Sequence, residues 1–272
     1  MAAMVFLAAP LCMCFALFGI HCYLGIHVLA RGVIFVDLAL AQVAAFGTVV
    51  AFALGYEHEH WKAYLISLGA TWVVAFFLAF SSRLKKQVSQ EALIGIIYAL
   101  ASASIILFLD HMSHGAEHLK QSLVGQLLWV TWGDVIQVLC VYSLVGLVHF
   151  VFRRKLMAAS FSDLDMHWVW NFLFYALFGV VITCSVQVAG VLLVFSFLIV
   201  PAIVSSMFFD KIAHRLICGW MLGVILSGIG MVLSYKWDLP SGAVIVVLFT
   251  LIPILLTLMV RKTAKRGLAV RR

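Results

Sequence analysis

Three histidines and a glutamate fall within eight residues of the sequence, in the segment HMSHGAEH. The four side chains belong to His111, His114, Glu117 and His118. Imidazole and carboxylate groups are common protein ligands of zinc and related divalent ions. In a helix, residues three or four apart share a face, so these ligands would point the same way. The spacing indicates a divalent-metal site, and the alternative is a polar loop whose histidines have no shared function.

Other candidate ligands lie elsewhere in the chain. The segment YEHEH holds His58 and His60, for which an incidental polar loop is the favoured interpretation. Asp37 is the one acidic residue within the first two apolar stretches. A carboxylate inside a membrane is costly to bury and is a functional candidate by default. A structural role is an equal alternative, either as a partner of Arg31 or as a polar group at a helix end.

The composition places these residues in or beside a membrane. Of the 272 residues, 65% are hydrophobic and 11% are charged, whereas soluble domains are about 45–50% apolar and about 25% charged. We expect an all-α polytopic membrane protein, with one transmembrane domain over residues 1–272. Apolar runs of about 20 residues predict spans at about 4–29, 33–55, 62–81, 90–109, 133–152, 168–186, 188–209, 212–235 and 240–260. Eight spans are an alternative, because the stretches flanking Gln187 could form one helix.

The basic residues are distributed unequally between the two sides of the membrane. With nine spans, all but three of the 18 Lys and Arg residues fall on one side. By the positive-inside rule, that side and the C-terminus are cytoplasmic. The histidine segments, including the loop at about 110–120, then lie outside. The net charge of +7 reflects this topology and requires no nucleic acid partner.

Three further segments carry a resemblance to a known family. They are GIHVLARGVIFVDLALAQVAAFG (25–47), VAGVLLVFSFLIVPA (188–202) and LSYKWDLPSGAVIVVL (233–248). In this order and spacing they resemble the permease subunits of ABC importers for zinc, manganese and iron. The resemblance covers essentially the whole chain. It implies the ABC importer permease architecture, with Zn²⁺, Mn²⁺ or Fe²⁺ as cargo and no permanently bound cofactor.

Physical features of these segments agree with the resemblance. Pro201 lies inside an apolar run and is expected to kink the seventh span, which makes it a candidate gating element. The small residues between Ala39 and Gly47 would let helix backbones approach closely. The sequence Asp238-Leu-Pro-Ser-Gly242 predicts a turn, with Asp or Ser available to cap the next helix.

The polar segment at about 153–168 is the longest cytoplasmic loop. In the family, the loop at this point carries a short coupling helix that docks on the ATPase subunit. Ser160 or Ser162 is expected to cap it, with two aspartates in its first turn, where the helix dipole favours acids. The candidate coupling residues are Ser160, Ser162, Asp163, Asp165 and His167. The alternative is a plain solvated loop.

One departure from the family pattern concerns the second span. The family has an aspartate and a histidine four residues apart, and these positions fall on Leu38 and Gln42. Leucine cannot bind a metal, and glutamine offers at most a weak amide oxygen. Asp37, one residue earlier, points about 100° away on a helix. We therefore expect an intramembrane site rebuilt around Asp37 or made of other groups.

The remaining polar residues of the spans are expected to be structural. His21 and His27 are predicted on roughly opposite faces of the first span, and His149 is predicted to reach the cytoplasmic surface. Glu91 and Asp134 lie near helix starts, where an acid complements the helix dipole.

The resemblance also implies partners. These are an ABC ATPase, an extracytoplasmic metal-binding protein and a second copy of the permease, in a bacterial inner membrane. The chain has no GxxxxGK[ST] motif, so ATP hydrolysis is assigned to the separate ATPase and the chain is not expected to be an enzyme. Zinc is the first choice of cargo because the histidines lie outside. Two alternatives are a haem-bearing electron-transfer membrane protein and a secondary metal carrier that works without ATP.

Overall fold

The chain is described from a computed structural model. The described residues are 2–56, 61–81, 88–110, 123–125, 127–161 and 168–269, with side chains described from residue 6 to residue 258. Several candidate residues lie outside this part of the chain. They are His58, His60, His111, His114, Glu117, His118, Ser162, Asp163, Asp165 and His167.

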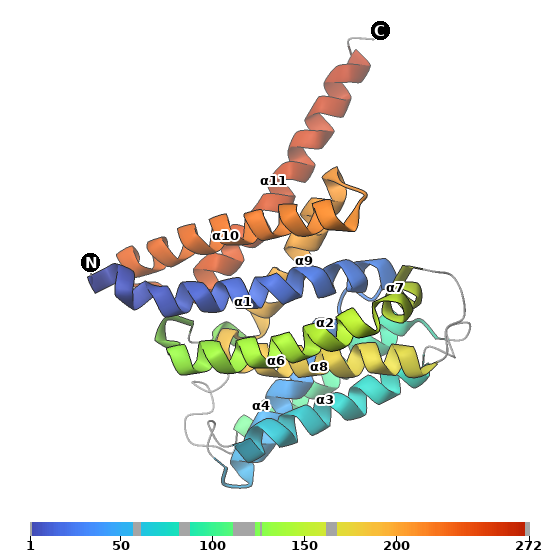
Figure 1. The fold of residues 1–272 in the computed structure, drawn as a ribbon, viewed down its shortest axis with the longest axis vertical. Helices are drawn as coiled ribbons and strands as arrows, with labels where there is room; N and C mark the ends of the chain where they lie inside the picture. Colours follow the sequence, from blue (N-terminus) through green and yellow to red (C-terminus); the bar gives the residue numbers. More distant parts are fainter. Residues whose placement is uncertain are drawn as a thin grey trace.

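The described residues are almost entirely helical (Figure 1). The elements are α1 (Ala2–Arg31), α2 (Val36–Ala53), α3 (Trp61–Ser81), α4 (Gln90–Leu109), the 3₁₀ turn η2 (Leu127–Trp129), α6 (Trp132–Val151), α7 (Arg153–Phe161), α8 (Trp168–Ala189), α9 (Val191–Phe208), α10 (Ile212–Trp237) and α11 (Ser241–Ala269). Within the described ranges, nine helices are long and apolar enough to cross a membrane. The helical membrane fold and the nine spans are therefore confirmed.

The eight-span alternative is wrong because α8 and α9 do not merge. Gly190 separates them with a φ of 76°, a backbone conformation that glycine adopts without steric cost. Gln187, where the sequence suggested a break or bend, lies within the last turn of α8. The break falls three residues later, at the residue whose backbone permits it.

Burial sorts the spans into inner and outer helices. The most buried are α2 and α9, with 72% and 67% of their residues buried, whereas α4 and the Ser241–Leu258 part of α11 have 22% each. α2 packs against α3, α4 and α8, and α1 packs against α9 and α10. The outer helices carry exposed large apolar side chains such as Leu100, Leu107 and Leu144. Faces of this kind suit lipid or a partner subunit.

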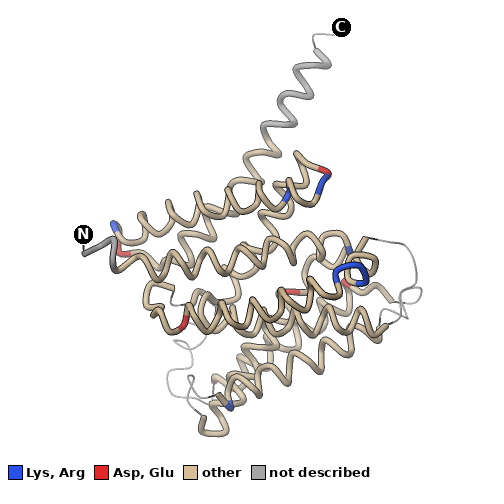
Figure 2. The backbone as a smooth tube through the Cα atoms, viewed as in Figure 1, with Lys and Arg blue, Asp and Glu red and all other residues tan. Residues whose placement is uncertain are grey.

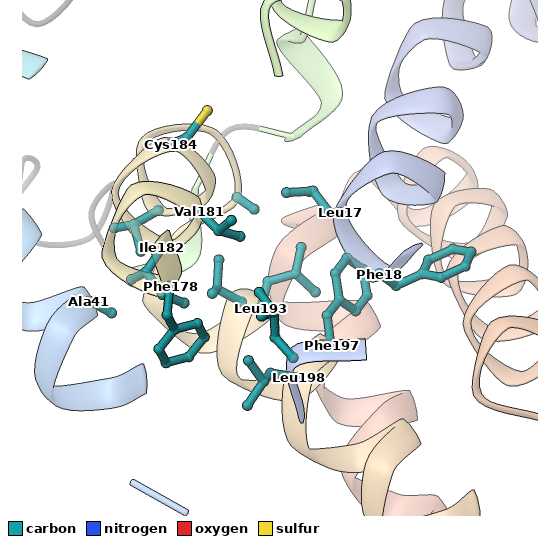
Figure 3. Close-up of a cluster of buried hydrophobic side chains, with 14 of the residues drawn as sticks. Leu17, Phe18, Ala41, Phe178, Val181, Ile182, Cys184, Leu193, Phe197 and Leu198 are labelled. Carbon is teal, nitrogen blue, oxygen red and sulfur yellow. The ribbon is translucent and has the colours of Figure 1, made fainter. Parts of the chain in front are cut away.

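Large apolar side chains fill the space between the inner helices (Figure 3). The labelled side chains come from α1, α2, α8 and α9, and are Leu17, Phe18, Ala41, Phe178, Val181, Ile182, Cys184, Leu193, Phe197 and Leu198. Phe18 of α1 meets Phe197 of α9 edge to face, with ring centroids 6.0 Å apart. This contact fixes α1 beside α9.

Small residues allow the closest helix contacts, as the sequence predicted. Gly47 of α2 lies against the backbone of Ser67 on α3, and the Ser67 hydroxyl donates to the Ala44 carbonyl at 2.7 Å. Gly25 of α1 lies against the backbone of Leu198 on α9. A side chain at either glycine would meet backbone atoms, which cannot rotate away.

Charged residues gather toward the two ends of the helices (Figure 2). Asp37 and Glu91 are in the first turns of α2 and α4, and Arg31 is in the last turn of α1. The helices alternate in direction along the chain, so these three residues belong to the same end of the bundle. The positive-inside rule predicts that this end is cytoplasmic.

The turn after α10 is confirmed, with one correction. Asp238 adopts a left-handed conformation with φ 50° and ends α10, so it does not cap the following helix. The Ser234 hydroxyl donates to the Leu239 carbonyl at 2.6 Å and holds the turn closed. α9 continues through Pro201 to Phe208, and the gating role of Pro201 stays a prediction.

Candidate functional site

The two positions of the family's metal motif lie on α2, the most buried span. Leu38 is half-buried and packs against the main apolar core. Gln42, one turn later, is 6% exposed. No group of three or more His, Cys, Asp or Glu side chains that could hold a metal ion exists among the residues described. The motif positions thus offer no imidazole or carboxylate ligand.

Asp37 is enclosed at the start of α2. Its side chain is 1% exposed, and no side chain hydrogen-bonds to its carboxylate. The polar groups that face it are the backbone N–H groups of Asp37 itself and of Leu38. Arg31, the partner that the sequence suggested, is held elsewhere. Its Nε donates to the Ser160 hydroxyl at 2.9 Å, and its Nη1 donates to the Asn171 side-chain oxygen at 2.9 Å. The pairing of Asp37 with Arg31 is therefore wrong, whereas its position at a helix end is confirmed.

A second carboxylate, that of Glu91, lies at the start of α4, a helix that packs against α2. Glu91 lies in the first turn of α4 as Asp37 lies in the first turn of α2. The Oε2 atom of Glu91 is buried without a hydrogen-bond partner. The neighbouring Gln90 holds the start of α4 in place, because its Nε2 donates to the Leu78 carbonyl at 3.3 Å and to the Tyr175 hydroxyl at 3.0 Å.

Ser160 joins the short helix α7 to the first span. Its hydroxyl lies 2.8 Å from Nδ1 of His27 and accepts the Nε–H of Arg31. One hydroxyl can accept from the guanidinium and donate to the imidazole at the same time. The predicted capping role of Ser160 is wrong, because α7 starts at Arg153 and Ser160 falls in its last turn. A short helix, α7, occurs in this segment, whereas the predicted helix with Asp163 and Asp165 in its first turn lies outside the described residues.

Aromatic rings and a second histidine surround this junction. The Arg31 guanidinium lies 3.9 Å from the centroid of the Phe174 ring. Nδ1 of His149 lies 3.3 Å from the Tyr23 hydroxyl. The His27 and His149 rings are 6.3 Å apart between centroids. His149 is 3% exposed, so the prediction that it reaches the cytoplasmic surface is wrong.

A separate polar chain crosses the middle of the bundle at His21. Its Nδ1 lies 2.6 Å from the Leu17 carbonyl, and its Nε2 lies 3.2 Å from the Ser185 hydroxyl. The Tyr142 hydroxyl lies 2.6 Å from the same Ser185 oxygen. His21 and His27 thus both contact the α6–α8 side of α1, contrary to the prediction of opposite faces. These hydrogen bonds agree with the structural role that the sequence favoured.

The sequence interpretation missed several of these partners. Asn171 and the Tyr142–Ser185 pair were not recognised. One signal was available, because Tyr142 and His149 are seven residues apart and therefore share a face of α6. Asp134 behaves as predicted, because it forms a capping box with Thr131 at the start of α6.

The segment before α6 packs onto the ends of three other spans. Gly125, with a φ of 69°, lies against the backbone of Ala189 and Gly190 between α8 and α9. The Val124 carbonyl lies against Gly242 at the start of α11. Leu127 in η2 is fully buried. These contacts tie the segment to the ends of α8, α9 and α11.

Comparison with known proteins identifies the family. Residues 4–261 match the sequence pattern of the ABC 3 transport family. The chain belongs to this family. Because the chain belongs to an ABC transport family, the electron-transfer and secondary-carrier alternatives are no longer supported. The chain is a multi-pass permease.

Several relatives match this ABC permease over most of their length. It is 26% identical over 239 residues to the manganese transport system membrane protein MntC of Halalkalibacterium halodurans, with 85% of this chain and 79% of that protein covered. It is 25% identical over 242 residues to manganese transport protein MntB of Synechocystis, covering 86% and 77%. It is 23% identical over 244 residues to the chelated iron transport protein YfeC of Yersinia pestis, covering 87% and 81%.

The fold of the ABC permease is also found in a solved structure. PsaBC from Streptococcus pneumoniae, in complex with a Fab, matches with a TM-score of 0.73 at 20% identity. The match covers 90% of this chain and 88% of that chain. The permease architecture predicted from the sequence is thus confirmed.

Proposed function

We propose that this permease, the membrane-spanning subunit of an ABC metal transport system, imports a divalent ion of the zinc, manganese and iron group. The family match over residues 4–261 is the observation that carries this proposal. The names of the relatives support it, because they specify manganese or chelated iron. The chain itself would perform no covalent chemistry, and the ion would pass through by alternating access.

The proposed assembly contains two copies of the permease and two ATPase subunits. An extracytoplasmic binding protein would deliver the ion from outside a bacterial inner membrane. The distribution of basic residues supports a cytoplasmic C-terminus. The exposed apolar faces of the outer helices would be divided between lipid and the second permease.

Ion entry is proposed at the outer histidine segment that contains His111, His114, Glu117 and His118, with His58 and His60 as further candidates. The position of the following segment supports this proposal. Gly125 packs between α8 and α9, and Val124 packs on the start of α11. A loop leading into that segment would end near the outer ends of α8 and α9, where a delivered ion would enter.

Coupling to the ATPase is proposed through α7 and the segment that follows it, which contains Ser162, Asp163, Asp165 and His167. Ser160 supports this route, because its hydroxyl contacts both His27 and Arg31 of α1. Asn171 extends the contact to α8. A movement of α7 would therefore be transmitted to α1, which packs against α9, and so to the proposed pathway.

Uptake measurements test the proposed function. Radioactive manganese, iron and zinc would each be offered to cells expressing this chain with its cognate ATPase and binding protein. The control replaces the ATPase with a variant that binds ATP without hydrolysing it. We expect uptake of at least one of these ions that disappears in the control. Uptake that persists in the control, or no uptake of any of the three ions, would overturn the proposal.

A further inference from the structure

Three consecutive basic residues, Arg153, Arg154 and Lys155, form the start of α7, one residue after the span α6 ends. All three side chains are exposed, and the start of α7 is a blue stretch in Figure 2. Among the described residues, none of the three contacts an acidic side chain. The next acids along the chain, Asp163 and Asp165, lie outside the described residues. We call these three residues the α7 basic patch, whose charge the described part of the chain does not balance.

Aromatic rings at the ends of two spans hold two of these side chains. The Cζ atom of Arg153 lies 4.6 Å from the centroid of the Phe150 ring, in the last turn of α6. The Nζ atom of Lys155 lies 5.9 Å from the centroid of the Trp170 ring, in the first turn of α8. A cation is attracted to the face of an aromatic ring at such distances. Both positive groups are therefore directed back toward the ends of the spans.

The side chains around the patch are those expected at a membrane surface. Phe150 and Val151, at the end of α6, are 65% and 63% exposed, so an apolar face continues up to the patch. The Phe152 ring lies 5.7 Å from the Trp170 ring, measured between centroids. Tryptophan is enriched where spans meet the lipid headgroups, and basic residues mark the cytoplasmic side. The patch is thus predicted to lie among the headgroups of the cytoplasmic leaflet.

α7 uses a different face for its packing against the bundle. Leu156 is fully buried, and Ser160, four residues later, is 6% exposed and contacts α1. The basic patch takes no part in these contacts. The first turn of α7 also has no acid, although the positive end of the helix dipole favours one there. An anion bound at the patch would offset both the basic side chains and the helix dipole.

We propose that the α7 basic patch binds the headgroup phosphate of an anionic phospholipid, with the acyl chains along the exposed face of α6. The phosphate would lie against Arg153, Arg154 and Lys155, and the chains against Phe150 and Val151. Basic pockets between spans on the cytoplasmic side suit such headgroups. This site goes beyond the proposed import function, and it does not depend on which ion is carried.

Two protein occupants fit the patch less well than a phospholipid. An ATPase would meet side chains that extend away from the membrane, whereas Arg153 and Lys155 lie against rings of the spans. A second permease that paired this patch with itself would bring positive charges together, and these repel. An anionic phospholipid offers a negative group and apolar chains at adjoining depths, which is the order found along α6 and α7.

Native mass spectrometry of the purified permease, without its ATPase, tests the proposal. The protein in a non-ionic detergent would be titrated with phosphatidylglycerol, and separately with phosphatidylcholine of the same acyl chains. We expect phosphatidylglycerol to be retained preferentially. A variant with Arg153→Gln, Arg154→Gln and Lys155→Gln should lower the affinity for phosphatidylglycerol on the order of a hundredfold, because each basic residue near an anionic surface contributes about fivefold.

The matched control combines Lys211→Gln and Arg215→Gln, two basic residues between α9 and α10 on the same predicted side of the membrane. The Arg215 Nε donates to the Phe209 carbonyl at 2.7 Å. This control should retain phosphatidylglycerol as the parent does. Thermal unfolding of each variant in the same detergent would establish that it is folded. Glycerol phosphate, which has the headgroup chemistry without the chains, should not displace the lipid.

Four results of these titrations would overturn the site. They are equal retention of the two lipids by the parent, equal affinity of the parent and the α7 variant for phosphatidylglycerol, displacement by glycerol phosphate, and a loss in the control as large as in the α7 variant. The third would indicate a site for free phosphate, and the fourth would mean that the lipid responds to total charge alone.

Co-purification of the cognate ATPase tests the alternative occupant. We expect the α7 variant to retain the ATPase as fully as the parent does. If the variant loses the ATPase and keeps phosphatidylglycerol, the patch belongs to the ATPase and the lipid site is wrong. The import function is tested separately, because failure of the unmodified permease to import any of the three ions would leave the lipid titrations unaffected.

Discussion

At the scale of single residues, the hydroxyl of Ser160 links the short helix α7 to the first span. Ser160→Ala would remove its contacts with His27 and Arg31. Leaving these groups unsatisfied should cost about 1–3 kcal/mol of stability. We also expect more ATP hydrolysed per ion imported, because α7 could move without moving α1. The measurement is the ratio of ATP hydrolysis to metal uptake in proteoliposomes containing the complete transporter.

Ser205→Ala is the control for this prediction. Ser205 is as buried as Ser160, but its hydroxyl donates only to the Ala202 carbonyl of its own helix. Its ratio of ATP hydrolysis to uptake should match that of the unmodified protein. If Ser160→Ala lowers hydrolysis and uptake in equal proportion, Ser160 contributes to stability alone and the proposed coupling route is wrong.

The sequence predicted the candidate residues better than their partners. The absence of the family's ligands at Leu38 and Gln42 could be read directly, as could the terminal position of Asp37. The packing of α4 against α2 could not, because the two helices are separated in the sequence by α3. Arg31 was assigned to Asp37 for the same reason, although Ser160 and Asn171 hold it.

At the scale of helices, the span boundaries followed from the apolar runs, but irregular elements did not. α7 has the polar sequence RRKLMAASF, which carries no apolar run, and it begins directly after α6. The predicted start of this helix was therefore wrong, and so was the predicted capping role of Ser160. The break between α8 and α9 depends on the backbone of Gly190, a property that an apolar run does not reveal.

The contact between α1 and α9 gives a prediction at this scale. Gly25→Ala would place a methyl group against the backbone of Leu198. Because backbone atoms cannot rotate away, the helices must separate, at a cost of about 1–3 kcal/mol. Thermal unfolding in detergent should show a lower transition temperature. Gly19→Ala, on the same helix with open space around it, should leave the transition unchanged or raise it, and equal losses in both variants would contradict the packing argument.

At the scale of the whole molecule, the nine spans and the basic residues together predict the orientation. Seven spans separate Tyr56 from the C-terminal segment, so the two must lie on opposite sides of the membrane. We expect a reporter that folds only in the cytoplasm to be active when fused to the C-terminus. A phosphatase that folds only outside should be active after Tyr56. The opposite pattern would reverse the topology, and activity of one reporter at both positions would mean an even number of spans between them.

The whole transport path gives the last prediction, which separates capture of the ion from its passage. Replacing His111, His114 and His118 by alanine should raise the metal concentration needed for half-maximal uptake and leave the maximal rate unchanged, because an entry site only concentrates the ion. Asp37→Asn should lower the maximal rate, because an inner site acts on every ion that passes. Initial uptake rates over a range of metal concentrations, at matched expression and saturating binding protein, distinguish the two effects.

His214→Ala is the control for this comparison. His214 is an exposed histidine at the start of α10, on the side predicted to be cytoplasmic, and its ring lies against Phe209. Removing this imidazole should change neither the metal concentration needed for half-maximal uptake nor the maximal uptake rate. If the triple histidine variant takes up metal normally at every concentration, the outer segment is not the entry site. If it lowers the maximal rate as Asp37→Asn does, the histidines lie on the path itself, and capture and passage would then depend on one continuous set of ligands.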